Sequence, residues 1–452
     1  MVDKLTRIYS EFRKIISVIK NYYYKADPQL EIPLDEYKRR QKLVLDALEK
    51  EGFKIGLVFS DEHYCGDVPY LGGNTNISIE QVAGILGNSG FHIIAGLEGG
   101  YIAEQLAPTA DAKVHKVELL KLADEDYPIK AEKIEDVLEA AANEKLENIQ
   151  KIALLTPRQV IPASITEYLN KLFGEENVID VQELYYEIKY EKSDIEMKLI
   201  EHACIIADAM MEGMLSVLKP GMLETEVAAW GYFIARMLGS EEDGFKIMVG
   251  ANEANRTLIG PALNREIKEG DYVHLGVAPK RDGLNSCIRR SVVVVDSLDK
   301  LTEHQKYWLE FIEEAYKVAF YKYVDIAKKE LPAKEQELAL LDFFKSKSKE
   351  VSEMYGKEIA LELLKPYTGT HNSGYTECQE FYGAITLDSD APLGNQIVMM
   401  LDVAVKGIGD NLNDVIIPDM DFIVIENTIG KFGKNIKTFT QLPLNCQDFI
   451  KY

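Results

Sequence analysis

The chain has 452 residues, of which 46% are hydrophobic and 28% are charged, and its formal net charge at pH 7 is −23. This length predicts two domains, and this composition is typical of a globular protein. The negative charge argues against binding to nucleic acid or to an anionic membrane, because both need a cationic surface. Five cysteines at irregular spacing predict no disulfide framework. We expect no signal peptide and no membrane span, and therefore a cytoplasmic protein.

The N-terminal part of the chain predicts a separate helix followed by a domain of alternating helices and strands. Residues 4–24 carry apolar side chains at helical spacing, and a proline-containing segment ends this helix. An amphipathic helix over 37–51 then leads into a buried strand over 54–60, and further helices and strands follow. We expect a helical extension over residues 1–35 and a smaller α/β domain over residues 36–185.

The remainder of the chain predicts long helices and a second sheet. Two helices, over 195–218 and 224–238, are joined by a Pro-Gly turn at 220–221. Strand-forming segments, two further long helices and more strands follow. We expect this second domain to span residues 186–452, which makes the fold class α+β.

Three segments carry motifs that occur together in one known family. Arg39–Gly73 contains a helix, a strand and a Tyr-Leu-x-Gly turn, and Ser193–Glu224 contains Lys-Pro-Gly-Met-Leu-Glu between two helices. In Gly270–Val295, Gly-Asp, Asp-Gly and Arg290 stand at the spacing of a metal-binding hairpin. The chain thus resembles the creatinase/aminopeptidase superfamily, which includes methionine aminopeptidase, Xaa-Pro dipeptidase and creatinase. The resemblance implies a pita-bread domain, with a curved antiparallel sheet and two helix pairs, preceded by a smaller α/β domain.

The hairpin departs from the family at its ligand positions. In metal-dependent members, two Asp, one His and two Glu hold a pair of divalent cations such as Mn or Co. The resemblance places the two aspartates on Gly276 and Cys287, and it places an upstream pocket histidine on Ile259. His274 precedes Gly276 by two residues, so strand alternation puts both on one face. These substitutions predict that no intact pair of hard cations is bound.

The remaining family positions fall between residues 370 and 430. The ligand histidine falls on His371, and a proton-handling histidine falls on Cys378. A ligand glutamate falls on Asp402, which keeps the carboxylate on a side chain shorter by one methylene. The final ligand glutamate has three alternatives in this sequence, namely Asp419, which the alignment of the strand favours, Asp421 and Glu426.

Each of these residues also has a purely structural interpretation. A lone cysteine on an apolar strand, such as Cys287, is more often a packed side chain than a nucleophile or ligand. A histidine beside Gly and Ser, such as His371, is more often a satisfied loop or core residue. Asp402 differs, because a carboxylate inside an apolar strand is unfavourable unless it is paired. Arg290 would be its partner if the protein has no site.

Three functions remain open from the sequence. The first is a hydrolase that cleaves a C–N bond of a small zwitterionic molecule or peptide without a cofactor, as the metal-free creatinase does. The second is a non-catalytic module that binds a ligand or a protein. The third is a hydrolase with a rebuilt site that holds a single Zn-like ion. The resemblance also implies a homodimer.

The hydrolase hypotheses assign roles to particular residues. His371 would be the general acid and base, and Asp402 would orient it, with Cys287 and Cys378 as further catalytic candidates. The substrate would contact three residues, namely Asp419, Ile259 and Arg290. A single ion would be held by His371 with Cys287 or Asp402, and His274 is a further candidate ligand.

Overall fold

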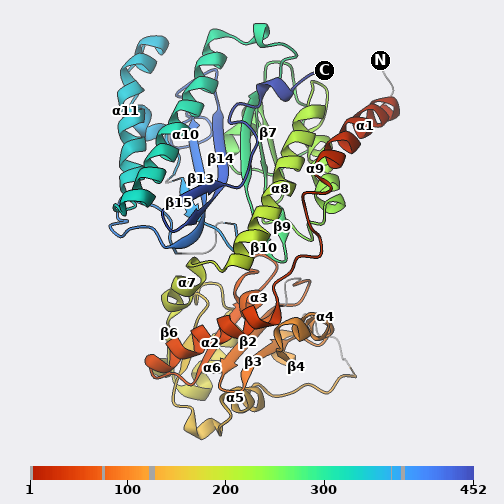
Figure 1. Ribbon diagram of the computed structural model, residues 1–452, viewed down its shortest axis with the longest axis vertical. Helices are drawn as coiled ribbons and strands as arrows, with labels where there is room; N and C mark the ends of the chain where they lie inside the picture. The colour runs from red at the N-terminus through yellow and green to blue at the C-terminus, as the bar shows by residue number, and fades with distance from the viewer. Residues whose placement is uncertain (1–3, 74–76, 122–127, 368, 378–381) are drawn as a thin grey trace. The chain divides into compact units, whose positions relative to one another are not determined.

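The computed structural model describes residues 4–73, 77–121, 128–367, 369–377 and 382–452, which group into two compact units. Unit 1 comprises residues 1–30, 192–373 and 383–452, and unit 2 comprises residues 31–191 and 374–382. Both units are labelled by element in Figure 1. No helix within the described ranges is long and apolar enough to cross a membrane.

Unit 2 is a mixed sheet with helices packed against it. Its strands are β1 (Ile55–Ser60), β2 (Val82–Gly87), β3 (Gly90–Ala95), β4 (Lys113–Lys116), β5 (Ile152–Leu154) and β6 (Val178–Asp180), in the order β4-β3-β2-β1-β5-β6. Its helices are α2 (Leu34–Lys50), α3 (Asp67–Gly72), α4 (Gly99–Leu106), α5 (Ile134–Ala142), α6 (Ala163–Phe173) and α7 (Gln182–Tyr190). Strand β1 is buried at every residue, as expected for a strand with neighbours on both faces.

A line of hydrogen-bonded polar side chains lies at the β3–β4 side of unit 2. Ser89 Oγ is 2.7 Å from His92 Nε2, and His92 Nδ1 is 2.9 Å from His115 Nε2. His115 Nδ1 is in turn 2.9 Å from a carboxylate oxygen of Glu132. His92 is only 1% exposed, and its burial, followed by His115 and Lys113, lowers its pKa to about 4. The imidazole of His92 is therefore neutral in the folded protein at pH 7.

Unit 1 is built on an antiparallel sheet of longer, curved strands (Figure 1). Its strands are β7 (Met248–Ala251), β8 (Tyr272–Val277), β11 (Ile288–Val293), β12 (Thr370–Asn372), β13 (Gln396–Lys406), β14 (Phe422–Phe432) and β15 (Asn435–Thr438). They follow the order β12-β13-β14-β11-β8-β7, with β15 beside β14, and β9 (Lys280–Arg281) and β10 (Leu284–Asn285) form a separate hairpin. The α+β class expected from the sequence is confirmed.

Helices cover one face of this sheet. They are α1 (Lys4–Tyr22), α8 (Asp194–Val217), α9 (Glu224–Met237), α10 (Glu303–Lys329) and α11 (Glu335–Tyr355). Helix α8 packs against β8 and β11, and α10 packs against β13 and β14. Val273, Leu275 and Val277 of β8 join the apolar core beneath α8 and α9, so their neighbours His274 and Gly276 project from the other face.

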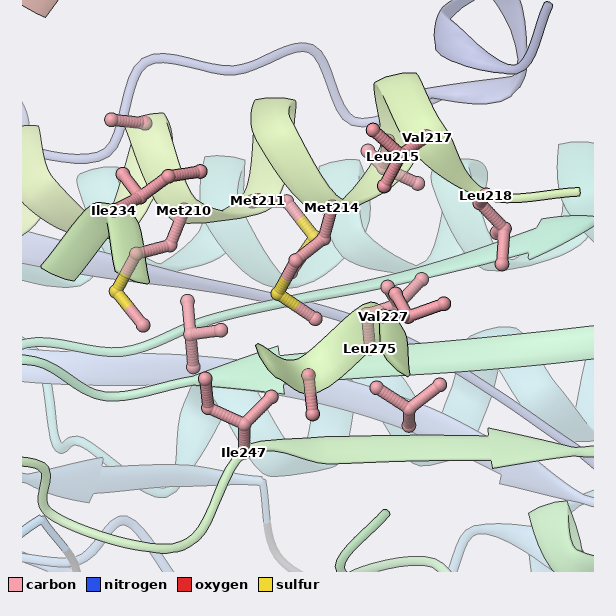
Figure 2. Packing of buried hydrophobic residues seen from close by; sticks show 14 of the residues in the cluster. Met210, Met211, Met214, Leu215, Val217, Leu218, Val227, Ile234, Ile247 and Leu275 are labelled. Carbon is pink, nitrogen blue, oxygen red and sulfur yellow. The ribbon is translucent and has the colours of Figure 1, made fainter. Parts of the chain in front are cut away.

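The core beneath α8 and α9 is rich in methionine (Figure 2). Met210, Met211 and Met214 of α8 are fully buried among Leu275 of β8 and other apolar side chains. Helix α8 begins with a capping box, in which the Ser193 hydroxyl and the Glu196 carboxylate each accept a backbone N–H.

Helix α1 is part of unit 1 and not a separate extension. Ile15, Val18 and Ile19 on one side of this helix belong to the same buried cluster as the methionines of α8. Its carboxylate Glu11 accepts a hydrogen bond from the Trp230 indole of α9 at 3.1 Å. The amphipathic pattern predicts the helix itself, but an apolar stripe does not identify which surface will cover it.

Candidate functional site

A row of positions crosses the sheet of unit 1 on the face that α8 does not cover. Gly276 of β8 is directly opposite Arg289 of β11, Arg289 is opposite Glu426 of β14, and Glu426 is opposite Asp402 of β13. Directly opposed residues of antiparallel strands project to the same face, so the side chains of this row lie together. Three ionisable groups thus meet on one face of the sheet.

The guanidinium of Arg289 is the cation of the row. Its Nη1 is 3.2 Å from Asp402 Oδ2, and its Nε is 3.9 Å from Glu426 Oε2. Nη1 also donates to the Tyr367 hydroxyl at 3.0 Å, and Nη2 donates to the backbone oxygen of Leu258 at 2.6 Å. Arg289, Asp402 and Glu426 are 3%, 5% and 1% exposed, so these interactions are shielded from water.

His371 and Cys287 lie beside the Glu426 carboxylate. The Nε2 atom of His371 is 3.7 Å from Glu426 Oε1, and its Nδ1 is 3.2 Å from the backbone oxygen of Asn372. Because a carbonyl oxygen can only accept, Nδ1 carries a proton and Nε2 is the nitrogen that can exchange a proton on the Glu426 side. The Cys287 sulfur is fully buried and within 4.8 Å of a Glu426 oxygen.

The environments of the two carboxyl groups move their pKa values in opposite directions. Burial, followed by the charge of Glu426, raises the pKa of Asp402. Burial alone would also raise the pKa of Glu426, but nearby His371 and the charge of Arg289 outweigh it and lower this pKa. A proton entering the pair therefore resides on Asp402, while Glu426 stays ionised. Such a division is typical of acid and base pairs in active sites.

Three buried atoms of the row have no hydrogen-bond partner within the part of the chain that the structure describes. They are Oδ1 of Asp402, Oε1 of Glu426 and Nε of Arg289. Buried polar atoms are nearly always paired, and exceptions point to a bound ligand or water. The row thus offers two acceptors and one donor to a small polar group.

The structure does not bring every predicted residue to this row. Asp419 is 41% exposed at its side chain and contacts His304 and the Tyr355 hydroxyl, which donates to it at 2.5 Å. Asp421 is paired with Arg256 at 2.7 Å. Of the three alternatives for the last carboxylate, Glu426 is the one that lies in the row.

The other substrate candidates also lie elsewhere. Arg290 projects to the helix-covered face, where it donates to the backbone oxygens of Pro443, Leu442 and Glu426. Asp402 is therefore paired with Arg289 and not with Arg290, because consecutive residues of a strand face opposite ways. The side chain of Ile259 is 66% exposed. Cys378 lies outside the described residues.

His274 faces the same side of the sheet as the row but has its own partner. Its Nδ1 is 2.5 Å from Asn255 Oδ1, and the Asn255 amide donates to the backbone oxygen of Phe422 at 2.7 Å. Complete burial, followed by the charge of Arg289, lowers the pKa of His274 well below its usual value. The imidazole of His274 is therefore neutral and held in place on the face of the sheet that carries the row.

Two signals in the sequence could have identified the residues that were missed. Glu426 interrupts the apolar strand Phe422–Ile425, which is the argument that already singled out Asp402. Arg289 is two residues after Cys287, so alternation along β11 places both on the site face and Arg290 on the opposite one.

The residues present do not fit a pair of hard divalent cations. Such ions need several carboxylates around them, and the first hairpin position is Gly276, which has no side chain. A guanidinium 3.2 Å from Asp402 already neutralises this carboxylate and would repel a divalent ion there. Cys287 and His371 each lie beside Glu426, and thiolate, imidazole and carboxylate are groups that bind zinc, so these side chains would suit a single ion on that side.

Sequence and structure comparisons give consistent similarities. Residues 198–375 match the model of metallopeptidase family M24. An Xaa-Pro dipeptidase of Pyrococcus horikoshii is 29% identical over 262 residues, which cover 57% of this chain and 70% of that protein. Among solved structures, the prolidase of the same organism superposes with a TM-score of 0.68 at 20% identity, covering 90% of this chain and 99% of that one. An X-Pro aminopeptidase of Thermotoga maritima gives 0.70 at 17% identity, with the same coverage.

Proposed function

Because residues 198–375 match the model of metallopeptidase family M24 and the fold matches that of a prolidase, we propose that this chain is a hydrolase of the creatinase/aminopeptidase superfamily that cleaves a C–N bond. The substrate class is a dipeptide or another small zwitterionic molecule, in keeping with the names of the relatives, Xaa-Pro dipeptidase and X-Pro aminopeptidase. The observation that carries the proposal is the pair of buried carboxyl groups, Asp402 and Glu426, whose pKa values are moved apart beside His371.

The proposed reaction divides the proton transfers between these residues. His371, with Glu426 beside its Nε2, accepts the proton of a water molecule whose oxygen attacks the carbon of the C–N bond. Asp402, whose raised pKa favours its protonated form more than that of an ordinary carboxyl group, donates a proton to the leaving nitrogen as that bond breaks. The products are an acid or its equivalent and an amine. Glu426, and not Asp419, is thus the carboxylate beside His371 in this proposal.

Two other functions have specific support. The loss of family groups at Gly276 and Ile259 favours a non-catalytic module that binds a small ligand or a protein. The closeness of Cys287 and of His371 to Glu426 favours a hydrolase with a single Zn-like ion. We further propose a cytoplasmic homodimer, as the family resemblance implies.

The test is a release assay for free amine with purified protein. The panel contains Xaa-Pro and other dipeptides, small amides and guanidino compounds, each assayed with a chelator and with added Mn²⁺, Co²⁺ or Zn²⁺. We expect turnover that the chelator does not abolish. We expect His371→Gln to lower kcat/KM by roughly 100-fold or more, since general acid–base catalysis contributes about 10²–10⁴-fold.

Matched variants distinguish the three functions. Glu426→Gln should lose activity like His371→Gln, whereas Asp419→Asn, on an exposed carboxylate bound to His304 and Tyr355, should keep it. Turnover that requires zinc and disappears with the chelator would favour the single-ion site. Binding of panel compounds with no turnover under any condition would favour the non-catalytic module.

A further inference from the structure

The side chain of Arg289 lies in the space that a side chain at position 276 would need. Gly276 and Arg289 are directly opposite each other on β8 and β11. A Cβ atom at position 276 would lie 3.1 Å from Arg289 Cγ and 3.2 Å from Met248 Sδ, closer than side chains normally pack. The position that holds a ligand aspartate in metal-dependent members therefore lacks a side chain where a long cationic side chain crosses it.

We propose that the guanidinium of Arg289 is the resident cation of this site and takes the place of the divalent ions. It lies against Asp402 and near Glu426, the two carboxylates that occupy the row. Without a cation, these directly opposed and buried carboxylates would repel each other. Arg289 supplies the countercharge from within the chain.

The position of this cation is fixed by several contacts. The Tyr367 hydroxyl and the Leu258 backbone oxygen accept from its two terminal nitrogens. The guanidinium carbon lies 5.4 Å from the centre of the Phe422 ring, a cation–π arrangement. Because arginine does not lose its proton in proteins, a divalent ion cannot displace this charge by deprotonation. The guanidinium therefore opposes a divalent ion beside Asp402 at any pH at which the protein is folded.

The proposal goes beyond the proposed function and does not depend on it. A resident guanidinium would replace the ions equally in a hydrolase and in a non-catalytic binding module. Its test therefore measures bound metal and thermal stability and not turnover, so that failure of one proposal leaves the other standing.

The experiment compares wild-type protein with variants of Arg289. Arg289→Met keeps the length of the side chain without its charge, and Arg289→Lys keeps the charge. Arg289→Gln is a second neutral variant, which retains amide donors if Arg289→Met does not fold. Arg290→Met is the matched control, because this neighbouring buried arginine faces the other side of the sheet. Each protein is dialysed with Co²⁺ or Mn²⁺, analysed for metal content, and melted with and without the ion.

We expect wild type, Arg289→Lys and Arg290→Met to retain no stoichiometric ion. For each of these proteins, the melting temperature should be the same with and without the added ion. The neutral variants at position 289 should bind Co²⁺ at least tenfold more tightly than wild type and melt higher in its presence, because ions bound only by the folded state stabilise it. A stoichiometric ion in wild type would overturn the proposal. Neutral variants that bind no more Co²⁺ than wild type would overturn it as well.

Discussion

At the scale of single residues, the site is defined by the pairing of a large side chain on one strand with a glycine on the neighbouring strand. Arg289 is long and charged, and Gly276 opposite it has no side chain. Either residue alone would be unfavourable: an arginine would meet a larger neighbour, and a glycine would leave a gap in a packed sheet. The two substitutions therefore have to be interpreted together, as one change in the chemistry of the site.

Gly276→Ala tests whether Arg289 needs a residue without a side chain opposite it. We expect it to lower the free energy of unfolding by about 1–2 kcal/mol, because the new methyl group overpacks against Arg289 Cγ and Met248 Sδ. The loss should be smaller in an Arg289→Ala background, which lacks the Cγ atom. Urea unfolding of the four proteins of this cycle gives the interaction energy. Equal losses in both backgrounds would show that the two side chains do not share space.

His92 gives a prediction for pH dependence. Its pKa is lowered from the ordinary value of 6.5 to about 4 in the folded protein. Between these two pH values the unfolded chain binds a proton that the folded chain does not, so stability falls as the pH falls from 6.5 to 4. The shift corresponds to roughly 3 kcal/mol.

His92→Phe should remove this part of the pH dependence. Urea unfolding of wild type and variant at pH 7 and pH 4.5 isolates the contribution of His92 to the pH dependence of stability, because the other titrating groups are common to both proteins. The variant loses its bonds to Ser89 and His115, so only the change between the two pH values is informative. An unchanged difference between pH 7 and pH 4.5 would contradict the assignment.

Residue-level prediction from the sequence was uneven for physical reasons. Motif spacing is sufficient to single out His371, Asp402 and Cys287, which the structure brings to one side of the sheet. It does not distinguish Glu426 from Asp419, because motif alignment ignores which strand residues are paired across the sheet. The pairing of Asp402 with Arg289 depends on the register of β11, β13 and β14, which local pattern alone does not determine.

At the scale of elements, the helix pair α8 and α9 depends on a small residue at its contact. Gly213 lies within α8, and a Cβ atom there would be 2.2 Å from Ile234 Cδ1 of α9. The helices therefore approach more closely than a larger side chain would allow, and the methionines of α8 fill the irregular space beneath (Figure 2).

Gly213→Ala should destabilise the protein by about 1–2 kcal/mol, even though alanine favours helix by about 1 kcal/mol over glycine. The clash with Ile234 Cδ1 outweighs the gain in helix propensity. Ile234→Val removes that atom, so the double variant should regain most of the loss. Thermal unfolding of both single variants and the double variant measures this compensation. If Gly213→Ala is as stable as wild type, the close approach of α8 and α9 at this position is refuted.

The elements themselves are well predicted where periodicity is strong. The expected helices over 195–218 and 224–238 correspond to α8 and α9 within a few residues, and the Pro-Gly turn joins them. Strong amphipathic repeats and glycine or proline breaks explain this agreement. The order of the strands in the two sheets cannot be predicted from the sequence, because pairing between distant segments leaves no local pattern.

At the scale of the whole molecule, the state of association remains a prediction. Helix α1 buries one side in unit 1, yet Leu5 and Tyr9 on its other side are 63% and 70% exposed. Exposed apolar residues that recur at helical spacing suit contact with a second copy. We expect light scattering at micromolar concentration to give twice the mass of the chain.

Variants identify the surface involved. Leu5→Glu with Tyr9→Glu should shift the protein towards monomer, because a buried unpaired charge opposes association. Tyr321→Glu is the control, since Tyr321 is 67% exposed on α10. A wild-type monomer at this concentration would contradict the homodimer, and an unaffected dimer in the double variant would place its interface elsewhere.

The contribution of α1 to unit 1 has a consequence for the kinetics of folding. Its residues pack against α8, which begins at Asp194, and unit 2 occupies the intervening stretch of chain. Contacts between segments so distant in sequence close a long loop and form slowly. We therefore expect helix α1 to dock on α8 late in folding, after the intervening segment 31–191 has been added to the chain. Until α1 docks, the part of α8 around Gly213, which Ile15 of α1 covers in the folded protein, stays exposed, and such apolar surface favours aggregation while the chain folds.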